Sequence, residues 1–216
     1  ADRMLDMGFY DDIMSIAKQL PEKRQTLLFS ATMPAKIREL ANKLLKNPAS
    51  ISLAISKPAA GITQLAYMCY DSQKIDLVRE ILKTKGKSLS HVLIFASSIK
   101  SVREIKRTLN KAGMRSSEMH SGLEQEQREQ TIREFKSKKI RILVATDILS
   151  RGIDIKGIEL VINYEVPHDA EDYVHRIGRT ARADRTGEAI TFINPKQVRD
   201  FMDIEKLIEK EVPKLN

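Results

Sequence analysis

Between Tyr173 and Arg182 the chain carries a histidine and three arginines in the pattern H-R-x-G-R-x-x-R. Arginine stays charged, and its planar guanidinium matches phosphate oxygens with two parallel hydrogen bonds. A helix beginning near Asp169 would place Arg179 and Arg182 on one face, because residues three apart are neighbours on a helix. Gly178 forms helices poorly and lets the backbone come close to a ligand. The pattern predicts a phosphate clamp, with a solvated basic face as the alternative.

In two further segments an apolar run is followed by residues that could bind a ligand. The run Ile142–Ala145 predicts a buried strand, and the polar residues that follow it are Thr146, Asp147, Arg151 and Asp154. The run Gln25–Phe29 is similar and leads into Ser30, Ala31 and Thr32, with Pro34 where a helix would begin. In open parallel sheets, ligands bind outside the carboxyl ends of the strands. Both strand ends are therefore candidate ligand-binding edges.

Five motifs occur along the chain in one order. They are S-A-T at 30–32, V-L-I-F-A-S at 92–97, Q-x-x-R at 125–128, A-T-D-x-x-x-R-G-x-D at 145–154 and H-R-I-G-R-T-x-R at 175–182. In this order they resemble the DEAD-box RNA helicase family, and the resemblance covers nearly the whole chain. The stretch Ile55–Ala59 resembles the bacterial RhlE-like branch of that family.

The resemblance implies an enzyme whose two RecA-like domains close over RNA and ATP with Mg²⁺. In the family, the second and third arginines of H-R-x-G-R-x-x-R reach the ATP γ-phosphate and stabilise charge on it, a role that falls here on Arg179 and Arg182. His175 and Arg176 would couple this catalytic site to residues across the interdomain cleft, namely Asp2, Ser30 and Thr32. A structural hydrogen-bonding role is the alternative for His175.

The resemblance also assigns ligand contacts to the second domain. Asp154, on a turn that Gly152 permits, would bind the ATP ribose, and a turn cap is its alternative. The expected RNA contacts are Arg128, Thr146, Ser97 and Arg151. Arg128 stands near the start of an expected helix, where backbone N–H groups could also meet a phosphate. A surface salt bridge to a neighbouring glutamate is the alternative for Arg128.

The first residues predict that the chain is the later part of a longer enzyme. In the family, A-D-R-M-L-D-M-G-F follows the Asp-Glu of the D-E-A-D box, so Ala1 and Asp2 would be its last two letters. The Walker A loop and the catalytic glutamate are expected before residue 1, and the fragment alone is expected to be inactive. Gly86-Lys87-Ser88 imitates the end of a phosphate-binding loop, but Ile81 stands where that loop needs its first glycine.

Composition and net charge limit which binding partners and which cellular compartment we expect. The net charge of +8 and the pI near 9.5 favour a polyanionic partner such as RNA, although many proteins are mildly basic. Aromatic residues make up 5% and Trp is absent, so backbone and phosphate contacts are expected rather than base stacking. Cys69 is the single cysteine, the four histidines are scattered, and no apolar run approaches the roughly 20 residues of a membrane span. These features predict a cytoplasmic protein with no metal site and no membrane partner. Ribosome-assembly and RNA-decay complexes are candidate partners.

The predicted fold class is α/β, with a RecA-like parallel sheet sandwiched by helices and preceded by the tail of a first RecA-like domain. The tail occupies residues 1–50, a linker 51–61 and the second domain 62–216. In the tail we expect helix Tyr10–Gln19, strand Gln25–Phe29 and helix Ala35–Leu45. Later strands are expected near Gln64–Tyr70, His91–Ala96, Ser116–Met119, Arg141–Ala145, Leu160–Asn163 and Glu188–Ile193. Later helices are expected near Gln73–Thr84, Lys100–Lys111, Gln125–Lys136, Ala170–Ile177 and Gln197–Glu209.

Three other functions are open at this point. The chain could be a binding module without catalysis, a helicase-related DNA motor, or a structural partner domain. An ATPase assay separates the first from an enzyme, and comparing RNA with DNA as the stimulating strand separates the second. The third leaves unexplained the arginines at ligand-facing ends of strands and helices.

Overall fold

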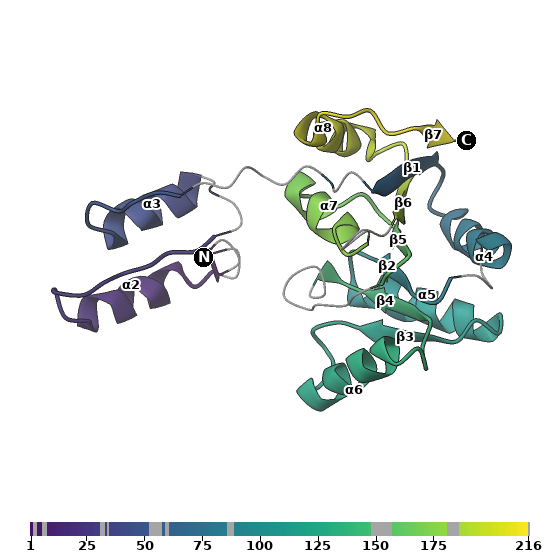
Figure 1. Ribbon diagram of the computed structural model, residues 1–216, viewed down its shortest axis with the longest axis horizontal. Helices are drawn as coiled ribbons and strands as arrows, with labels where there is room; N and C mark the ends of the chain where they lie inside the picture. The colour runs from purple at the N-terminus through teal and green to yellow at the C-terminus, as the bar shows by residue number, and fades with distance from the viewer. Residues whose placement is uncertain are drawn as a thin grey trace. The chain divides into compact units, whose positions relative to one another are not determined.

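The computed structural model describes residues 1, 4–5, 8–30, 33, 35–51, 58, 61–85, 89–147, 157–180 and 186–215. The chain forms two compact units, Ala1–Ala54 and Ile55–Asn216, which we treat separately (Figure 1). Most of the expected linker at 51–61 lies outside the described residues. No helix built from described residues is long and apolar enough to cross a membrane.

The first unit contains α2 (Tyr10–Gln19) and α3 (Ala35–Leu44), as the sequence predicts. Helix α3 buries Ile37, Leu40 and Ala41 on one face. The expected strand Gln25–Phe29 is wrong, because that segment has no regular secondary structure. A strand needs a hydrogen-bonded neighbour, and the described part of this unit contains no other strand to pair with it.

The second unit is built on a seven-stranded, entirely parallel sheet in the order β3-β4-β2-β5-β6-β1-β7. The strands are β1 (Ile62–Met68), β2 (Val92–Phe95), β3 (Ser116–Met119), β4 (Ile142–Ala145), β5 (Leu160–Asn163), β6 (Gly187–Ile193) and β7 (Lys214–Leu215). Strands β4, β2 and β5, which are neighbours inside the sheet, are buried along their whole length. This is why they read as continuous apolar runs rather than alternating ones.

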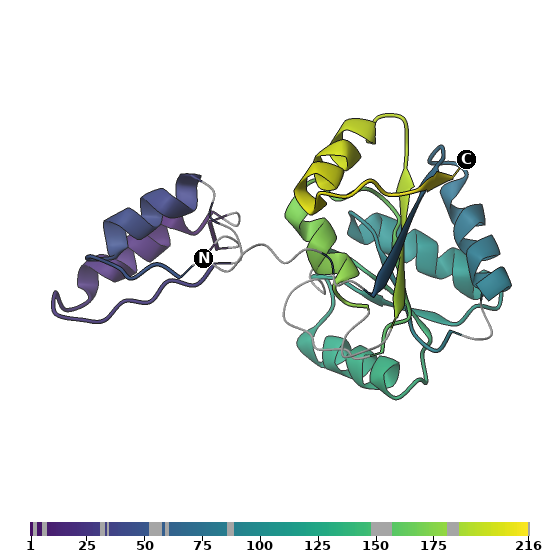
Figure 2. The same cartoon turned by 45° about the horizontal axis from the view of Figure 1, so that its top comes forward.

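Helices cover both faces of the sheet (Figures 1 and 2). They are α4 (Lys74–Lys85), α5 (Ile99–Lys111), α6 (Gln125–Lys136), α7 (Ala170–Ile177) and α8 (Val198–Ile208). Along β2, Val92 and Ile94 pack with α4 and α5, while Leu93 and Phe95 pack with α6 on the other side. Helices α7 and α8 pack with β1 and β6 in a third apolar cluster, on the same face of the sheet as α6. The α/β class with a parallel sheet between helices is therefore confirmed.

Helix α7 ends earlier than the phosphate-clamp argument requires. The N–H of Gly178 caps it by donating to the Val174 carbonyl at 2.9 Å, and Arg179 follows outside the helix. The prediction that Arg179 and Arg182 share one helical face is therefore wrong for Arg179, which lies beyond the helix. Arg182 lies outside the described residues. A Cβ built on Gly178 would lie 2.9 Å from the Val174 oxygen, so the tight end of α7 requires glycine.

Candidate functional site

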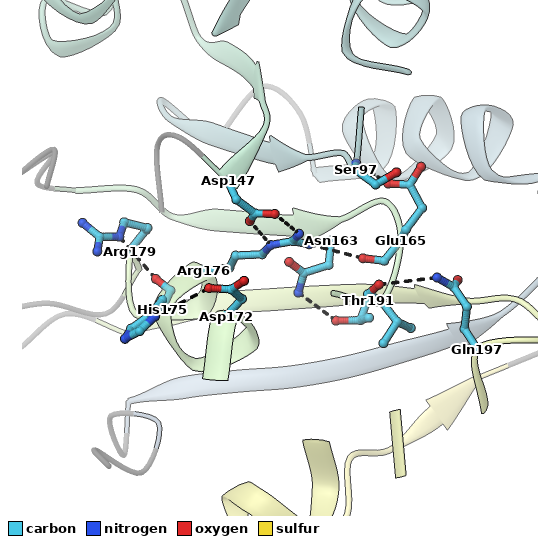
Figure 3. A network of polar contacts seen from close by, with 11 residues as sticks. Ser97, Asp147, Asn163, Glu165, Asp172, His175, Arg176, Arg179, Thr191 and Gln197 are labelled. Atoms are coloured by element: carbon cyan, nitrogen blue, oxygen red, sulfur yellow. Dashed lines mark hydrogen bonds and ion pairs between the residues drawn. The ribbon is translucent and has the colours of Figure 1, made fainter. Parts of the chain in front are cut away.

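The carboxyl ends of β4 and β5 and the last turn of α7 meet at one partly buried ion pair (Figure 3). Arg176 is 2% exposed and donates two hydrogen bonds to Asp147, from Nε to Oδ1 at 2.6 Å and from Nη2 to Oδ2 at 2.7 Å. Its Nη1 donates to the Glu165 carbonyl at 3.3 Å, and its guanidinium carbon lies 5.3 Å from the centre of the Phe95 ring. Two of the sequence motifs are thus joined directly, because Asp147 belongs to A-T-D and Arg176 to H-R-I-G-R.

This geometry gives Arg176 a structural role inside the second unit. It fixes Asp147, the second residue after β4, against α7. The coupling of Arg176 to the first unit stays a prediction. Ser30 is half-buried in the first unit, and the other expected partners, Asp2 and Thr32, lie outside the described residues.

His175 and Arg179, which belong to the same motif as Arg176, lie beside this pair. Arg179 Nε donates to the His175 carbonyl at 3.2 Å, and Figure 3 shows its guanidinium directed away from Asp147. His175 Nδ1 is buried and lies 3.9 Å from Asp172 Oδ1, too far for a hydrogen bond. Among the described residues Nδ1 has no hydrogen-bond partner. This nitrogen therefore does not have the structural hydrogen bond that was the alternative role for His175.

Thr146 and Ser97 stand at neighbouring strand ends, as expected from the topology. Thr146 is half-buried, and its N–H donates to the Met119 carbonyl at 3.1 Å, which joins the ends of β4 and β3. Ser97 follows β2 and is exposed, and its N–H donates to Glu165 Oε2 at 3.0 Å. The main chain at both positions is therefore fixed by hydrogen bonds.

Arg128 braces the loop that follows β3. Its Nε donates to the Leu123 carbonyl at 2.9 Å and its Nη2 to the Ser121 carbonyl at 3.0 Å. Within the described part of the chain these carbonyls are its partners, and no ion pair joins it to a neighbouring glutamate. The loop begins at His120, which is fully buried and accepts the Gly122 N–H at Nδ1 (3.2 Å). Arg128 thus sets the shape of the loop at the start of α6.

Glu165 is a site residue that the sequence reasoning missed. Burial raises the pKa of its carboxyl, against the lowering effects of the Ser97 N–H and of the charges of Lys74 and Arg176. Glu165 joins β2 and β5 through its carboxylate and accepts Arg176 through its carbonyl. The signal was present in the sequence, since an acidic residue follows the apolar run Leu160–Asn163 as Asp147 follows Ile142–Ala145.

Several expected site residues lie outside the described residues: Asp2, Thr32, Arg151, Gly152, Asp154 and Arg182. Their roles stay predictions. The residues that the structure describes contain no cluster of histidine, cysteine or acidic side chains that could hold a metal ion. The expectation of Mg²⁺ therefore rests on the resemblance alone. Cys69 is buried, and burial raises the pKa of its thiol, as expected for an inert cysteine.

Two family models match the chain. The helicase conserved C-terminal domain matches residues 73–184, and the DEAD/DEAH box helicase model matches residues 1–40. The first match contains the Arg176–Asp147 pair and four of the five motifs named above.

Curated relatives and solved structures agree with these models. The chain is 40% identical to the ATP-dependent RNA helicase CshA of Listeria monocytogenes, over all of this chain and 41% of that protein. It is 39% identical to the DEAD-box ATP-dependent RNA helicase RhpA of Helicobacter pylori, over 98% of this chain and 43% of that protein. The chain therefore spans less than half the length of these relatives.

Among solved structures, S. cerevisiae Dbp5 bound to RNA and ADP BeF3 matches with a TM-score of 0.86 and 30% identity, over 99% of this chain and 57% of that one. A DEAD box protein of Methanococcus jannaschii matches with a TM-score of 0.68 and 38% identity, over 100% and 58%. These neighbours confirm the RecA-like fold class. The chain belongs to the DEAD-box helicases and carries their helicase conserved C-terminal domain.

Proposed function

We propose that this chain supplies the second RecA-like domain of an ATP-dependent RNA helicase that couples ATP hydrolysis to local unwinding of RNA duplexes. The observation that carries the proposal is the partly buried Arg176–Asp147 pair, which holds the A-T-D and H-R-I-G-R motifs together at the carboxyl edge of the sheet. The relatives are named as RNA helicases, which supports the same activity. The RhlE-like branch rests on the stretch Ile55–Ala59, while the relatives carry the names CshA, RhpA and DeaD.

In this proposal residues 1–50 belong to the first domain, 51–61 to a linker and 62–216 to the second domain. ATP with Mg²⁺ would be bound mainly by the first domain, with Asp154 and Gly152 at the ribose. The protein would act in the cytoplasm on RNA backbones with little sequence preference, alone or within ribosome-assembly or RNA-decay complexes.

Arg179 and Arg182 would carry the catalytic contribution of this domain by stabilising charge on the γ-phosphate. Arg179 suits this role because its main chain is fixed next to the buried Arg176, while its side chain extends away from Asp147 (Figure 3). His175 Nδ1 would find its hydrogen-bond partner only when the two domains close, since the described residues offer it none. An arginine finger is worth about 10³-fold or more in rate.

Thr146, Ser97, Arg128 and Arg151 would contact RNA. The first three are described and stand at or beside the carboxyl ends of β4, β2 and β3. Arg128 would act partly through the loop 121–123 whose carbonyls it binds, so Arg128→Ala should weaken RNA binding for all sequences alike.

The test uses the full-length protein with Arg182→Ala and Arg182→Lys, which separate a planar fork from a simple positive charge. Steady-state ATP turnover at saturating RNA should fall about 10³-fold in both, while nucleotide affinity measured separately changes little. The exposed Lys206→Ala is the matched surface control. Near wild-type turnover in Arg182→Lys would show that Arg182 is not the arginine finger. The role would then belong to Arg179 or to neither arginine. Equal stimulation by RNA and DNA would favour the rival DNA motor.

A further inference from the structure

An open groove of about 570 Å³ lies between α5 and β3, away from the strand ends described above. Four basic residues and one acid take part in its lining, which consists of Arg103, Lys106, Arg107, Asn110, Lys111 and Glu118. The acid is already paired, because Lys106 Nζ donates to Glu118 Oε1 at 3.1 Å and Glu118 is 20% exposed. The groove is therefore strongly positive.

Three of the basic residues share one stripe of α5. Arg103, Arg107 and Lys111 are four residues apart and exposed, and none of their side chains has a hydrogen bond or ion pair with a described residue. Residues at this spacing stand about 5–6 Å apart on a helix. Like charges at this spacing destabilise a helix, so the stripe lowers the stability of α5 unless an anion neutralises it.

Contacts through β3 connect the groove to the proposed RNA-binding edge. Glu118 Oε2 lies 3.7 Å from Nε2 of His120, the residue at which β3 leads into its loop. His120 is fully buried, and its Nε2 has no hydrogen-bond partner among the described residues. On the other side of the ring, Nδ1 accepts the Gly122 N–H inside the loop braced by Arg128. A chain of contacts thus runs from the groove to the Arg128 loop.

We propose that this groove is a second phosphate-binding surface, which takes the backbone of an RNA segment beyond the contacts at the strand ends. The proposal rests on the proposed RNA-binding function and extends its footprint along α5. RNA fits the groove because its phosphates form a regular line of charge, and arginine binds phosphate bidentately. The contacts would go to the backbone alone, so they would add affinity without sequence preference.

The test is the salt dependence of binding of a labelled single-stranded polyuridylate to the 216-residue chain, followed by fluorescence anisotropy. The double variant Arg103→Ala with Arg107→Ala should lower the slope of log K against log salt by about 1.4, because each lost phosphate contact removes about 0.7. The matched control removes two exposed basic residues of α8, Arg199 and Lys206, and should leave the slope unchanged.

The possible results separate a failure of the groove proposal from a failure of the proposed function. If the groove variant keeps the wild-type slope while Arg128→Ala weakens binding, the groove proposal fails and the proposed function stands. If neither variant matters, both fail. If polyglutamate displaces the labelled RNA as effectively, charge for charge, as unlabelled polyuridylate does, the groove recognises acidic protein and the assignment to RNA is overturned. Far-UV circular dichroism should show the wild-type fold in the groove variant and in its α8 control, because the residues altered in both are exposed.

Discussion

Replacing Asp147 with asparagine removes the charge that neutralises Arg176 and keeps the shape of the side chain. The Arg176 side chain is 3% exposed, whereas that of Asp147 is 42% exposed. Breaking a fully buried ion pair costs about 3–5 kcal/mol, because the remaining charge has no partner. Exposed pairs are worth about 0.2–1 kcal/mol.

The structure places this pair between those limits. Water reaches Asp147, which reduces the value of the pair, while Arg176 keeps the Glu165 carbonyl and the Phe95 ring as partners. We therefore expect Asp147→Asn to lower the free energy of unfolding of the second unit by about 2 kcal/mol. For a unit of this size that corresponds to a fall in Tm of about 4–8 °C.

The assay is urea unfolding followed by far-UV circular dichroism, with the midpoint compared at a constant slope. Asp203→Asn is the matched control, because Asp203 is 67% exposed and pairs with Lys206 at 2.9 Å on the surface. It should cost less than about 0.5 kcal/mol. In an Arg176→Met background, Asp147→Asn should cost less than it does in the wild type, since the buried charge is gone. Equal effects of Asp147→Asn and Asp203→Asn would refute the reasoning.

Two half-buried carboxyls, whose pKa values are shifted in opposite directions, should give opposite pH dependences in the same assay. Burial raises the pKa of Glu165, so the folded state holds this proton more tightly than the unfolded state does. The free energy of unfolding therefore falls as pH rises from the ordinary glutamate pKa through the raised one. Over that interval Glu165→Gln should become more stable relative to the wild type. Burial also acts to raise the pKa of Glu159, but hydrogen bonds from the main-chain N–H groups of His91 and Ser90 outweigh it and lower that pKa. The stabilisation by Glu159 is present above the ordinary glutamate value and is lost as pH falls through the lowered pKa, so Glu159→Gln should be less stable at neutral pH and approach the wild type in acid. A constant difference from the wild type across pH, for either variant, would contradict its prediction.

The fold could be predicted where burial alone decides the structure. Strands β2, β4 and β5 are buried on both faces, so their apolar runs mark them with bounds correct to about a residue. Strand β7 was missed, because Lys214–Leu215 is short, exposed and without a pattern. Gln25–Phe29 shows the opposite error. Its pattern is that of a strand, but a strand also needs a partner, and local sequence does not say whether one is present.

The site could be predicted as a set of residues but not as a set of contacts. Spacing identified Arg176 as part of a basic cluster, yet its bidentate partner Asp147 belongs to a distant motif. Arg128 was expected either to meet phosphate or to pair with a glutamate. In the structure it binds two loop carbonyls, which replaces the glutamate pair, and its contact with phosphate stays a prediction. Long-range pairing of this kind follows from the order of the strands, which periodicity does not give.

The order of the strands also explains how the fold positions Arg179. The residue before Gly178 is Ile177, which is fully buried in the cluster shared by α7, α8, β1 and β6. The residue after Arg179 is Thr180, which is 1% exposed and donates to the Ile158 carbonyl at 2.6 Å. Arg179 is thus held between two buried anchors while its own side chain is half-exposed. Because the main chain is already fixed, only the side-chain rotamers of Arg179 lose entropy when a ligand arrives, which lowers the cost of placing a charge-stabilising arginine.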